Sequence, residues 1–352
     1  MANWYTTREQ IKKAGQLFGS DRHPIIDRTI EAVSNSISLR TRRNFIPKTD
    51  TILYRWPQVF SDETGTLWLQ DDLLSVTTLQ TKAQNTTPTT IASTDFFIEP
   101  NQFGPPYDRI EIDESSTASF ESGDTQQRSI SVNGSWGYSN NTTNAGTVTS
   151  GLSSDATATS MVISDGAVID VGQTLLIESE QIFVTEKTSA AEPNSDLLNG
   201  ALTADRSEAV TVDSGSRYTL NEVILVDSEE MLITGISGNV LAVTRAYNST
   251  TLATHSDDTA VHVFRTLTIE RGINGTTAAT HANSTAISKY IPEYAIQQLT
   301  VAMTLAQLAQ EGSAWGRQVG KGDGAFEYSG RSFNKYVDEV MHQWQRPREA
   351  AI

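Results

Sequence analysis

The chain has 352 residues, of which only 19% are charged, and this composition suits two or three β-rich, loop-rich domains. It contains no cysteine, which excludes disulfide scaffolds, thiol catalysis, zinc fingers and iron–sulfur sites. The formal net charge is −16, and most acidic residues fall within 57–289, which argues against broad nucleic-acid binding because neutralising phosphates requires Lys and Arg.

Residues 1–55 have the periodicity and capping signals of helices. Thr7 is a candidate N-cap, with Gln10 as its capping-box partner. A second helix is expected near Pro24, with one apolar face formed by Ile26, Ile30, Val33 and Ile37. Pro47 predicts that this helix has ended before it.

Three arginines, Arg40, Arg42 and Arg43, fall at the end of the second predicted helix. Cations there oppose the negative end of the helix dipole. The same residues could contact DNA phosphates or an acidic neighbouring subunit. They are therefore candidates for an interface or a DNA-facing site.

Residues 51–138 contain short β-branched and aromatic runs separated by Asp, Gly, Pro and Asn, which predicts β-hairpins packed on the helices. The runs are TILYRWP, TLWLQ, LSVTTLQ, FFIEP, RIEID and RSISVNGSWGY. Trp56, Trp68, Trp136 and Tyr138 lie in these runs, where core or interface packing is favoured over stacking on sugars or bases. Residues 139–160 have almost no large apolar side chain and are expected to form a linker.

An internal repeat follows. Residues 171–185 and 220–234 share four of fifteen positions at an offset of 49. Residues 245–261 and 271–287 share nine of seventeen positions at an offset of 26. A simple tandem duplication would give a single offset.

Two offsets indicate that one small β-unit is inserted within another copy. The outer unit is predicted at about 161–188 plus 266–288, and the inner unit at about 208–265. This nesting requires the strand within 171–185 to share a sheet with residues 267–271.

Helical periodicity returns after Lys289, with Pro292 in a first turn. A glycine-rich stretch follows and is expected to act as a hinge, with Gly316, Gly320, Gly322 and Gly324 as its candidate residues. A last helix has one apolar face, made by Phe333, Tyr336, Val337, Val340, Met341 and Trp344. Pro347 is expected to end this helix.

No catalytic, cofactor or metal site is predicted. No two histidines have the spacing of a metal-binding helix turn. Residues 316–322 differ from a phosphate loop, because three residues rather than four separate the glycines and Gly322 stands where Ser or Thr is needed. No signal peptide or membrane segment is evident. We therefore expect a protein that is not an enzyme.

Two features of the repeat have structural interpretations. His255 and His281 occupy the same repeat position, which favours a hydrogen bond to a turn over a ligand role. The acidic pairs within 177–180 and 227–230 are interpreted as solvated strand ends rather than as calcium or glycosidase carboxylates.

In chain order, these segments resemble the head–tail connector family of tailed bacteriophages, also called portal adaptors or head-completion proteins. The likeness rests on four phrases: Arg43-Asn44-Phe45, Leu73–Val76, Ser135-Trp136-Gly137-Tyr138 and a Pro-initiated helix at 290–309. It covers about residues 5–138 and 290–346. The chain departs from the family by carrying residues 139–289 between the last two phrases.

The resemblance implies a homo-oligomeric ring, twelve-fold in the particle, that docks beneath the portal protein and contacts downstream neck and tail proteins. Genomic DNA would pass through its lumen without sequence-specific binding. The protein would lie in the virion neck after assembly in the host cytoplasm, with no membrane contact. The C-terminal helix and tail would reach the portal, with Phe333, Tyr336, Val340, Trp344, Arg346 and Arg348 as the candidate residues.

The predicted class is α+β. A helical-bundle adaptor core with β-hairpins is expected from residues 1–138 and 290–352, and an inserted all-β module of two nested units from 139–289. The flanks should close into one core that contains Ile30 and Leu299, with the insert at the periphery. A neck or tail fibre-anchoring protein and a carbohydrate-binding adhesin remain alternatives.

Overall fold

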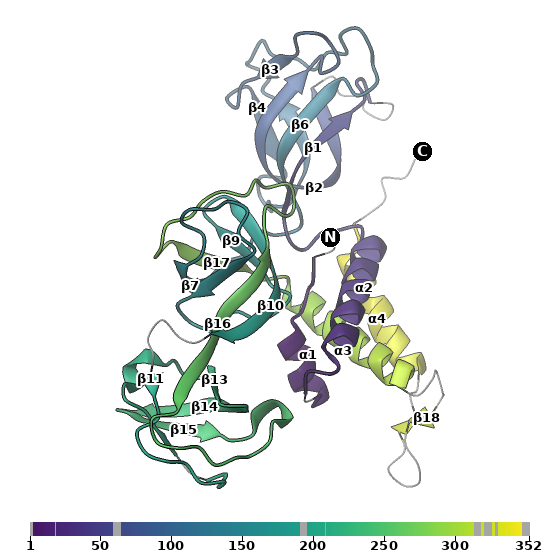
Figure 1. Ribbon diagram of the computed structural model, residues 1–352. Coiled ribbons are helices and arrows are strands. Elements are labelled where there is room, and N and C mark those ends of the chain that lie inside the picture. Colours follow the sequence, from purple (N-terminus) through teal and green to yellow (C-terminus); the bar gives the residue numbers. More distant parts are fainter. Residues whose placement is uncertain are drawn as a thin grey trace.

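The computed structural model describes residues 3–17, 19–58, 65–190, 196–207, 209–312, 318–319, 326–327 and 330–346. These residues form an α+β fold that is mostly β, with antiparallel sheets of six and eleven strands, a two-stranded hairpin and four α-helices. Figure 1 shows a β-lobe at the top, two further β-lobes beneath it and the helices along one flank. The predicted α+β class is confirmed.

Helices occur near both ends of the described chain. They are α1 (Arg8–Gly15), α2 (His23–Thr41), α3 (Tyr294–Gly312) and α4 (Gly330–Trp344). Thr7 caps α1 as predicted, because its side chain accepts a hydrogen bond from the Gln10 amide at 3.1 Å. Pro24 lies in the first turn of α2, where a missing N–H leaves no helical bond unmade.

Helices α2 and α3, from opposite ends of the chain, pack against each other through two buried clusters. The first cluster contains Ile37 and Leu299. The second contains Ile30, and Leu305 packs against it. The two flanks therefore meet, but the expectation that Ile30 and Leu299 share one cluster is wrong.

The predicted helical-bundle core is not found among the described residues. Residues from outside the helices complete both clusters: Phe45 belongs to the first, and Val171 and Phe183 belong to the second. Helix α1 has only eight residues, which is too short to bury a long apolar stripe by itself. The helices form a layer that shares its core with the outer barrel and nearby segments, whereas the β-hairpins of residues 51–138, which were expected to pack on the helices, bury a core of their own.

The upper β-lobe contains the first six strands. They are β1 (Lys48–Tyr54), β2 (Thr66–Thr81), β3 (Thr89–Ile91), β4 (Phe96–Glu99), β5 (Tyr107–Ile112) and β6 (Ile130–Trp136). Their order is β1-β6-β2-β5-β4, with β3 beside β2. The runs TLWLQ and LSVTTLQ, expected as two strands, form the single strand β2. Its pairing with β6 shifts register twice, because bulges let a long strand bend.

Two of the four singled-out aromatic residues lie in the core of this lobe. Trp56 and Trp136 are 7% and 1% exposed and belong to its buried cluster, which confirms the packing interpretation for both. Trp68 is half-buried, with the Arg109 guanidinium 5.4 Å from its ring centre. Tyr138 lies beyond the lobe and packs against the cluster shared by α2 and α3.

The eleven-stranded sheet begins in the segment that was expected to be a linker. Its strands are β7 (Thr142–Ser150), β8 (Ser160–Ile163), β9 (Thr174–Ile177), β10 (Glu180–Ala190), β11 (Asp196–Leu197), β12 (Val210–Thr211), β13 (Val223–Val226), β14 (Glu229–Ser237), β15 (Val240–Thr244), β16 (Ala260–Glu270) and β17 (Ala286–Tyr290). The linker prediction is wrong because three small or medium apolar residues, Ala145, Val148 and Leu152, suffice to anchor this segment in the core. The remaining short elements are β18 (Gln318–Val319), β19 (Phe326–Glu327) and the 3₁₀ turns Gly215–Arg217 and Tyr247–Ser249.

Strand pairing closes the eleven-stranded sheet into two barrels. In the outer barrel the pairing runs β7-β8-β16-β10-β9-β17 and returns to β7. In the inner barrel it runs β11-β16-β13-β14-β15-β12 and returns to β11 by the Leu198–Val212 bridge. In each barrel three consecutive strands pair in sequence and the next returns beside the first of them, which is a Greek key.

The two barrels pair their strands in the same register. The corresponding pairs are Glu180–Ile177 with Glu229–Val226, Phe183–Glu270 with Leu232–Thr244, and Thr188–Thr266 with Ser237–Val240. Both long hairpins shift register at the same point, after Val184 in the outer barrel and after Ile233 in the inner barrel. The pairing that nesting requires is present, since Val184 pairs with Ile269.

The inner barrel takes the place of a hairpin turn of the outer barrel. In the inner barrel, Ser237 and Val240 are joined by a two-residue turn, 238–239. The corresponding residues of the outer barrel, Thr188 and Thr266, also pair, but the inner barrel lies between them in the chain. Strand β16 consequently belongs to both barrels.

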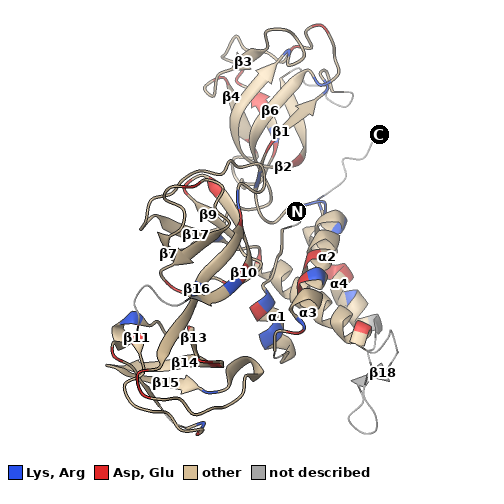
Figure 2. Cartoon of the chain, in the orientation of Figure 1, with Lys and Arg blue, Asp and Glu red and all other residues tan. Residues whose placement is uncertain are grey.

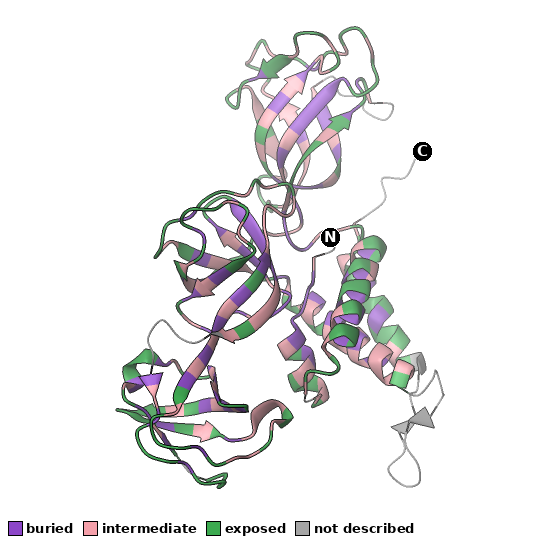
Figure 3. Ribbon diagram, in the orientation of Figure 1, coloured by how far each residue is buried: buried purple, intermediate pink, exposed green. Residues whose placement is uncertain are grey.

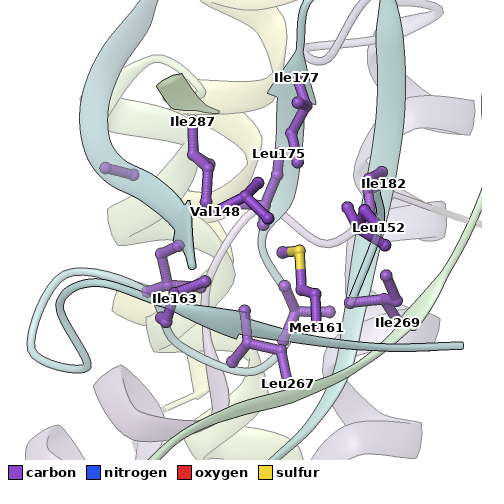
Figure 4. Close-up of a cluster of buried hydrophobic side chains, with 13 residues drawn as sticks. Val148, Leu152, Met161, Ile163, Leu175, Ile177, Ile182, Leu267, Ile269 and Ile287 are labelled. Carbon is purple, nitrogen blue, oxygen red and sulfur yellow. The ribbon is translucent and has the colours of Figure 1, made fainter. Parts of the chain in front are cut away.

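Each barrel has a hydrophobic core of its own. Thirteen buried residues of the outer barrel, among them Met161, Leu267 and Ile269, converge from different strands (Figure 4). Buried and more exposed residues alternate along β16 (Figure 3), so that one face of this strand supplies both cores. Val261 and Val263 enter the inner core.

The inserted module was expected to be peripheral, and this expectation is wrong for the outer barrel. Val171 and Phe183 share a buried cluster with Trp4, which precedes α1. The Thr49 amide donates a hydrogen bond to the Asn274 carbonyl at 2.8 Å. The outer barrel is therefore part of the body that the helices cover.

We predict that the inner barrel can be removed without unfolding the rest of the protein. Because Thr188 and Thr266 are cross-strand partners, replacing residues 189–265 by Asn-Gly should join β10 and β16 through a two-residue hairpin turn. Circular dichroism and thermal unfolding should show a folded, cooperative protein. Deleting the whole module, residues 146–288, should instead expose Trp4 and cause aggregation; equal stability of the two deletion variants would contradict this interpretation.

Candidate functional site: the junction of the C-terminal helix

Four of the six predicted portal-binding residues lie on α4, and three of these four face inward. Phe333, Val340 and Trp344 pack against the cluster that contains Ile37 and Leu299. Tyr336 is 37% exposed and remains available to solvent. The apolar face predicted for this helix is therefore present, but the chain uses it for its own core.

The opposite face of α4 is polar and borders an open hollow. The residues that line this hollow are Asn334, Lys335, Asp338, Glu339 and His342. None of these residues is among the site residues predicted from the sequence, although their spacing along the helix places them opposite the apolar stripe. They form the solvent-facing side of α4 in this conformation.

The end of α4 is held by Arg346. The guanidinium of Arg346 lies 2.5 Å from an Asp72 carboxylate oxygen and donates to the Leu69 carbonyl at 2.8 Å. The backbone amide of Arg346 donates to the Thr41 carbonyl at 2.9 Å. One residue thus ties the C-terminal helix to both β2 and the end of α2.

Asp72 receives a second arginine. Arg43 Nε lies 3.5 Å from the other Asp72 oxygen, and the Arg43 guanidinium lies 4.7 Å from the centre of the Tyr138 ring. Burial raises the pKa of Asp72, although the charges of Arg43 and Arg346 act to lower it. A buried carboxylate between two guanidiniums fixes the position of three chain segments.

Four aromatic rings pack beside this ion pair. The Trp344 ring centre lies 5.1 Å from that of Tyr138 and 6.1 Å from that of Phe45, both near perpendicular. The Tyr5 ring meets Phe45 edge-on at 5.5 Å. Edge-to-face contacts of this kind hold aromatic side chains in one arrangement.

The three arginines at the end of α2 have three different environments. Arg40 pairs with Asp338 of α4 at 2.7 Å, where both side chains are largely exposed. Arg42 is exposed and adopts the left-handed conformation that ends α2. Arg43 turns toward Asp72. These three arginines therefore do not form one continuous cationic patch. Among the described residues, Arg40 and Arg43 each form an ion pair, whereas Arg42 is exposed and forms none.

The remaining predicted site residues cannot be placed. The hinge candidates Gly316, Gly320, Gly322 and Gly324 lie outside the described residues. Arg348 also lies outside the described residues.

A second set of polar groups repeats once in each barrel. Glu180 is fully buried and accepts from Arg271 at 2.7 Å and from His281 at 2.8 Å. The other ring nitrogen of His281 contacts Glu178, whose side chain is 63% exposed, in the β9–β10 turn. The prediction of a histidine hydrogen bond to a turn is confirmed.

The corresponding group in the inner barrel has the same partners. Glu229 pairs with Arg245 at 2.7 Å and with His255 at 2.9 Å, and His255 contacts Asp227 at 2.7 Å. The interpretation of both acidic pairs as solvated strand ends is correct for Glu178 and Asp227, which are exposed. It is wrong for Glu180 and Glu229, which are buried. The buried carboxylate is part of a clasp that ties the loop 245–255 to a hairpin.

These clasps account for the charge state of their glutamates. Burial acts to raise the pKa of Glu229, but hydrogen bonds from Arg245, His255 and two backbone amides outweigh it and lower the pKa to about 2. The corresponding donors lower the pKa of Glu180 to about 2 as well. The described residues contain no group of three His, Asp or Glu side chains that could hold a metal ion.

Comparison with known proteins gives no relative: no protein family, curated protein or solved structure matches this chain. Among the described helices, none is long and apolar enough to cross a bilayer. The resemblance to head–tail connectors therefore rests on the residues themselves.

The Asp72 junction can be tested by substitution. Asp72→Ala should cost about 3 kcal/mol of unfolding free energy, because it leaves two guanidiniums that are only 16% and 12% exposed without their carboxylate. Arg42→Ala, the matched control, should change it by less than about 0.5 kcal/mol. Urea unfolding measures both variants, and a wild-type midpoint for Asp72→Ala would contradict the junction's structural role.

The clasps predict a loss of stability in acid. Because the pKa of Glu180 and Glu229 falls from the ordinary 4.5 to about 2, their contribution is complete above pH 4.5 and is lost as the pH falls toward 2. Thermal unfolding between pH 6 and pH 2.5 should show this decline. It should be weaker in Glu229→Gln and unchanged in Asp258→Asn, an exposed carboxylate of the inner barrel outside the clasp; equal slopes in all three proteins would refute the assignment.

Proposed function

We propose that this protein is a structural virion protein, a portal adaptor that forms a ring below the portal and links capsid to tail. In this proposal residues 1–138 and 290–352 are the adaptor body. Residues 139–289 are an inserted module of two related β-units, one nested within the other. The ring conducts DNA and has no enzymatic activity.

One observation carries the proposal. Three of the four phrases that resemble the adaptor family lie far apart along the chain, yet their residues Phe45, Tyr138 and Tyr290 meet in or against one buried cluster. The fourth phrase, Leu73–Val76, contributes Leu73 to the core of the upper β-lobe instead. This convergence supports an adaptor body assembled from both ends of the chain.

The surface charge of the barrels supports a passive role toward DNA. Three arginines of the module, Arg245, Arg265 and Arg271, are consumed by buried glutamates. Because each of these pairs is neutral, the excess of acidic over basic residues in the module is left to its remaining side chains, and Figure 2 shows few Lys or Arg on the strands and loops of the barrels. Such a surface repels phosphates and lets DNA pass without binding.

The environment of α4 modifies the portal-contact hypothesis. Because Phe333, Val340 and Trp344 pack internally, a partner that meets α4 in this conformation would contact Tyr336 and the polar side lined by Lys335 and Glu339. A ring of identical subunits would be closed by heterologous contacts between different faces of neighbours. Twelve-fold symmetry follows from the family resemblance alone.

Electron microscopy of the purified protein with its portal tests the proposal. Twelve-fold rings stacked on the portal are the expected result. Monomers that fail to bind portal but bind glycans on an array would favour the adhesin alternative. Attachment only to fibre proteins would favour the fibre-anchoring alternative, and either result would overturn the adaptor assignment.

A further inference from the structure

The N-terminal segment is the point where the helices hold the barrels. Trp4 lies against Gly172, where any side chain would overlap its ring, and meets the Phe183 ring edge-on at 5.4 Å. The Arg8 amide donates to the Val171 carbonyl at 3.1 Å. Figure 1 shows α1 between the α2–α3 pair and the two barrels.

Arg8 joins the same bodies by charge. Its side chain is 3% exposed and pairs with Asp27 of α2 at 2.6 Å and with Glu186 of the outer barrel at 2.7 Å. This buried cation has two carboxylates, and the arrangement resembles the fully paired clasps within the barrels. Charged residues of α1 accordingly lie beside β10 in Figure 2.

Glu9 is paired differently. Its carboxylate accepts a hydrogen bond from the Val171 amide at 3.1 Å, but no ion pair to it is formed among the described residues. The charged and titratable groups around it are Arg8 and Lys12 of α1, Asp170 and Lys187 of the outer barrel, and Tyr247 of the inner barrel. Asp170 and Lys187 themselves lie 3.8 Å apart, and the Lys187 ammonium donates to the Gly166 and Ile169 carbonyls.

We propose that α1 is a proton-sensitive clamp, in which the carboxyl group of Glu9 sets how tightly the helices hold the outer barrel. The neutral carboxyl group accepts the Val171 hydrogen bond without opposing Asp170. The ionised carboxylate places a second negative charge against Asp170 inside the interface. The clamp is tight when Glu9 is protonated and loosens when Glu9 ionises.

The pH range follows from the environment of Glu9. Burial and the charge of Asp170 raise its pKa to about 7, with Lys187 and Arg8 acting in the opposite direction. When the clamp opens, the carboxyl group regains its ordinary pKa of about 4.5. The opening equilibrium constant should therefore rise on the order of a hundredfold between pH 4.5 and pH 7, and then level off.

His23 lies at the far end of the same cluster and titrates separately. Its Nδ1 lies 3.2 Å from Arg8 and its Nε2 lies 3.1 Å from Lys12. Burial and these two cations lower the pKa of His23 below its ordinary 6.5. His23 takes up a proton more readily when the clamp opens, which favours the open form in acid; this effect is opposite in sign to that of Glu9, so His23 does not produce a loss of protection with rising pH.

Hydrogen exchange of the Arg8 and Val171 amides tests the clamp, because both amides bond across the interface. After correction for intrinsic exchange, their protection should fall by one to two orders of magnitude between pH 5 and pH 7.5 in the wild-type protein. Glu9→Gln should abolish this dependence. Glu31→Gln, an exposed carboxylate of α2, should leave it intact.

A second variant separates charge from packing. Asp170→Asn should move the transition to lower pH, because it removes the charge that opposes Glu9 ionisation. A pH response in Glu9→Gln equal to that of the wild-type protein, or no response in the wild-type protein, would overturn the proposal. The result is independent of ring formation, so the clamp and the adaptor function succeed or fail separately.

Discussion

The shared strand β16 constrains the whole inserted module. One continuous strand pairs with β11 and β13 in the inner barrel and with β8 and β10 in the outer barrel. Its side chains alternate strictly, and its buried face serves both cores. A strand cannot rotate about its axis without turning that face outward, so the orientation of one barrel fixes that of the other. The contacts of Trp4 and Arg8 fix the outer barrel against the helices, and β16 joins the inner barrel to it.

Within this frame, the buried ion pairs determine loop positions more than overall stability. Glu180, Glu222 and Glu229 each face an arginine, and all three carboxylates are fully buried. Removing charges from water costs about as much as their attraction returns, so such pairs contribute mainly by leaving few alternative arrangements. The acidic pairs within 177–180 and 227–230, which in the sequence resemble the carboxylates of calcium or glycosidase sites, therefore have a structural role. The helical layer uses the same device at Asp72, where two arginines meet one carboxylate.

The sequence predicted local features well where the deciding interactions are local. The Thr7 cap, the first-turn Pro24 and the apolar face of α4 depend on neighbours within a few residues, and all three are found. The repeat offsets likewise predicted strand pairs, because copies of one unit keep one register. The linker prediction failed at β7, whose Thr and Asn residues resemble a loop until a neighbouring strand pairs with them.

By itself, the sequence determined the α+β class, the helices at both ends and the repeat with two offsets, because periodicity, caps and register are written in adjacent residues. Only the tertiary structure decided that Ile30 and Leu299 lie in separate clusters, that the outer barrel belongs to the body, and that Trp344 and Arg346 turn inward. These outcomes depend on contacts between residues far apart in the chain. An apolar face or a charged side chain specifies that it needs a partner, but not which distant segment provides it.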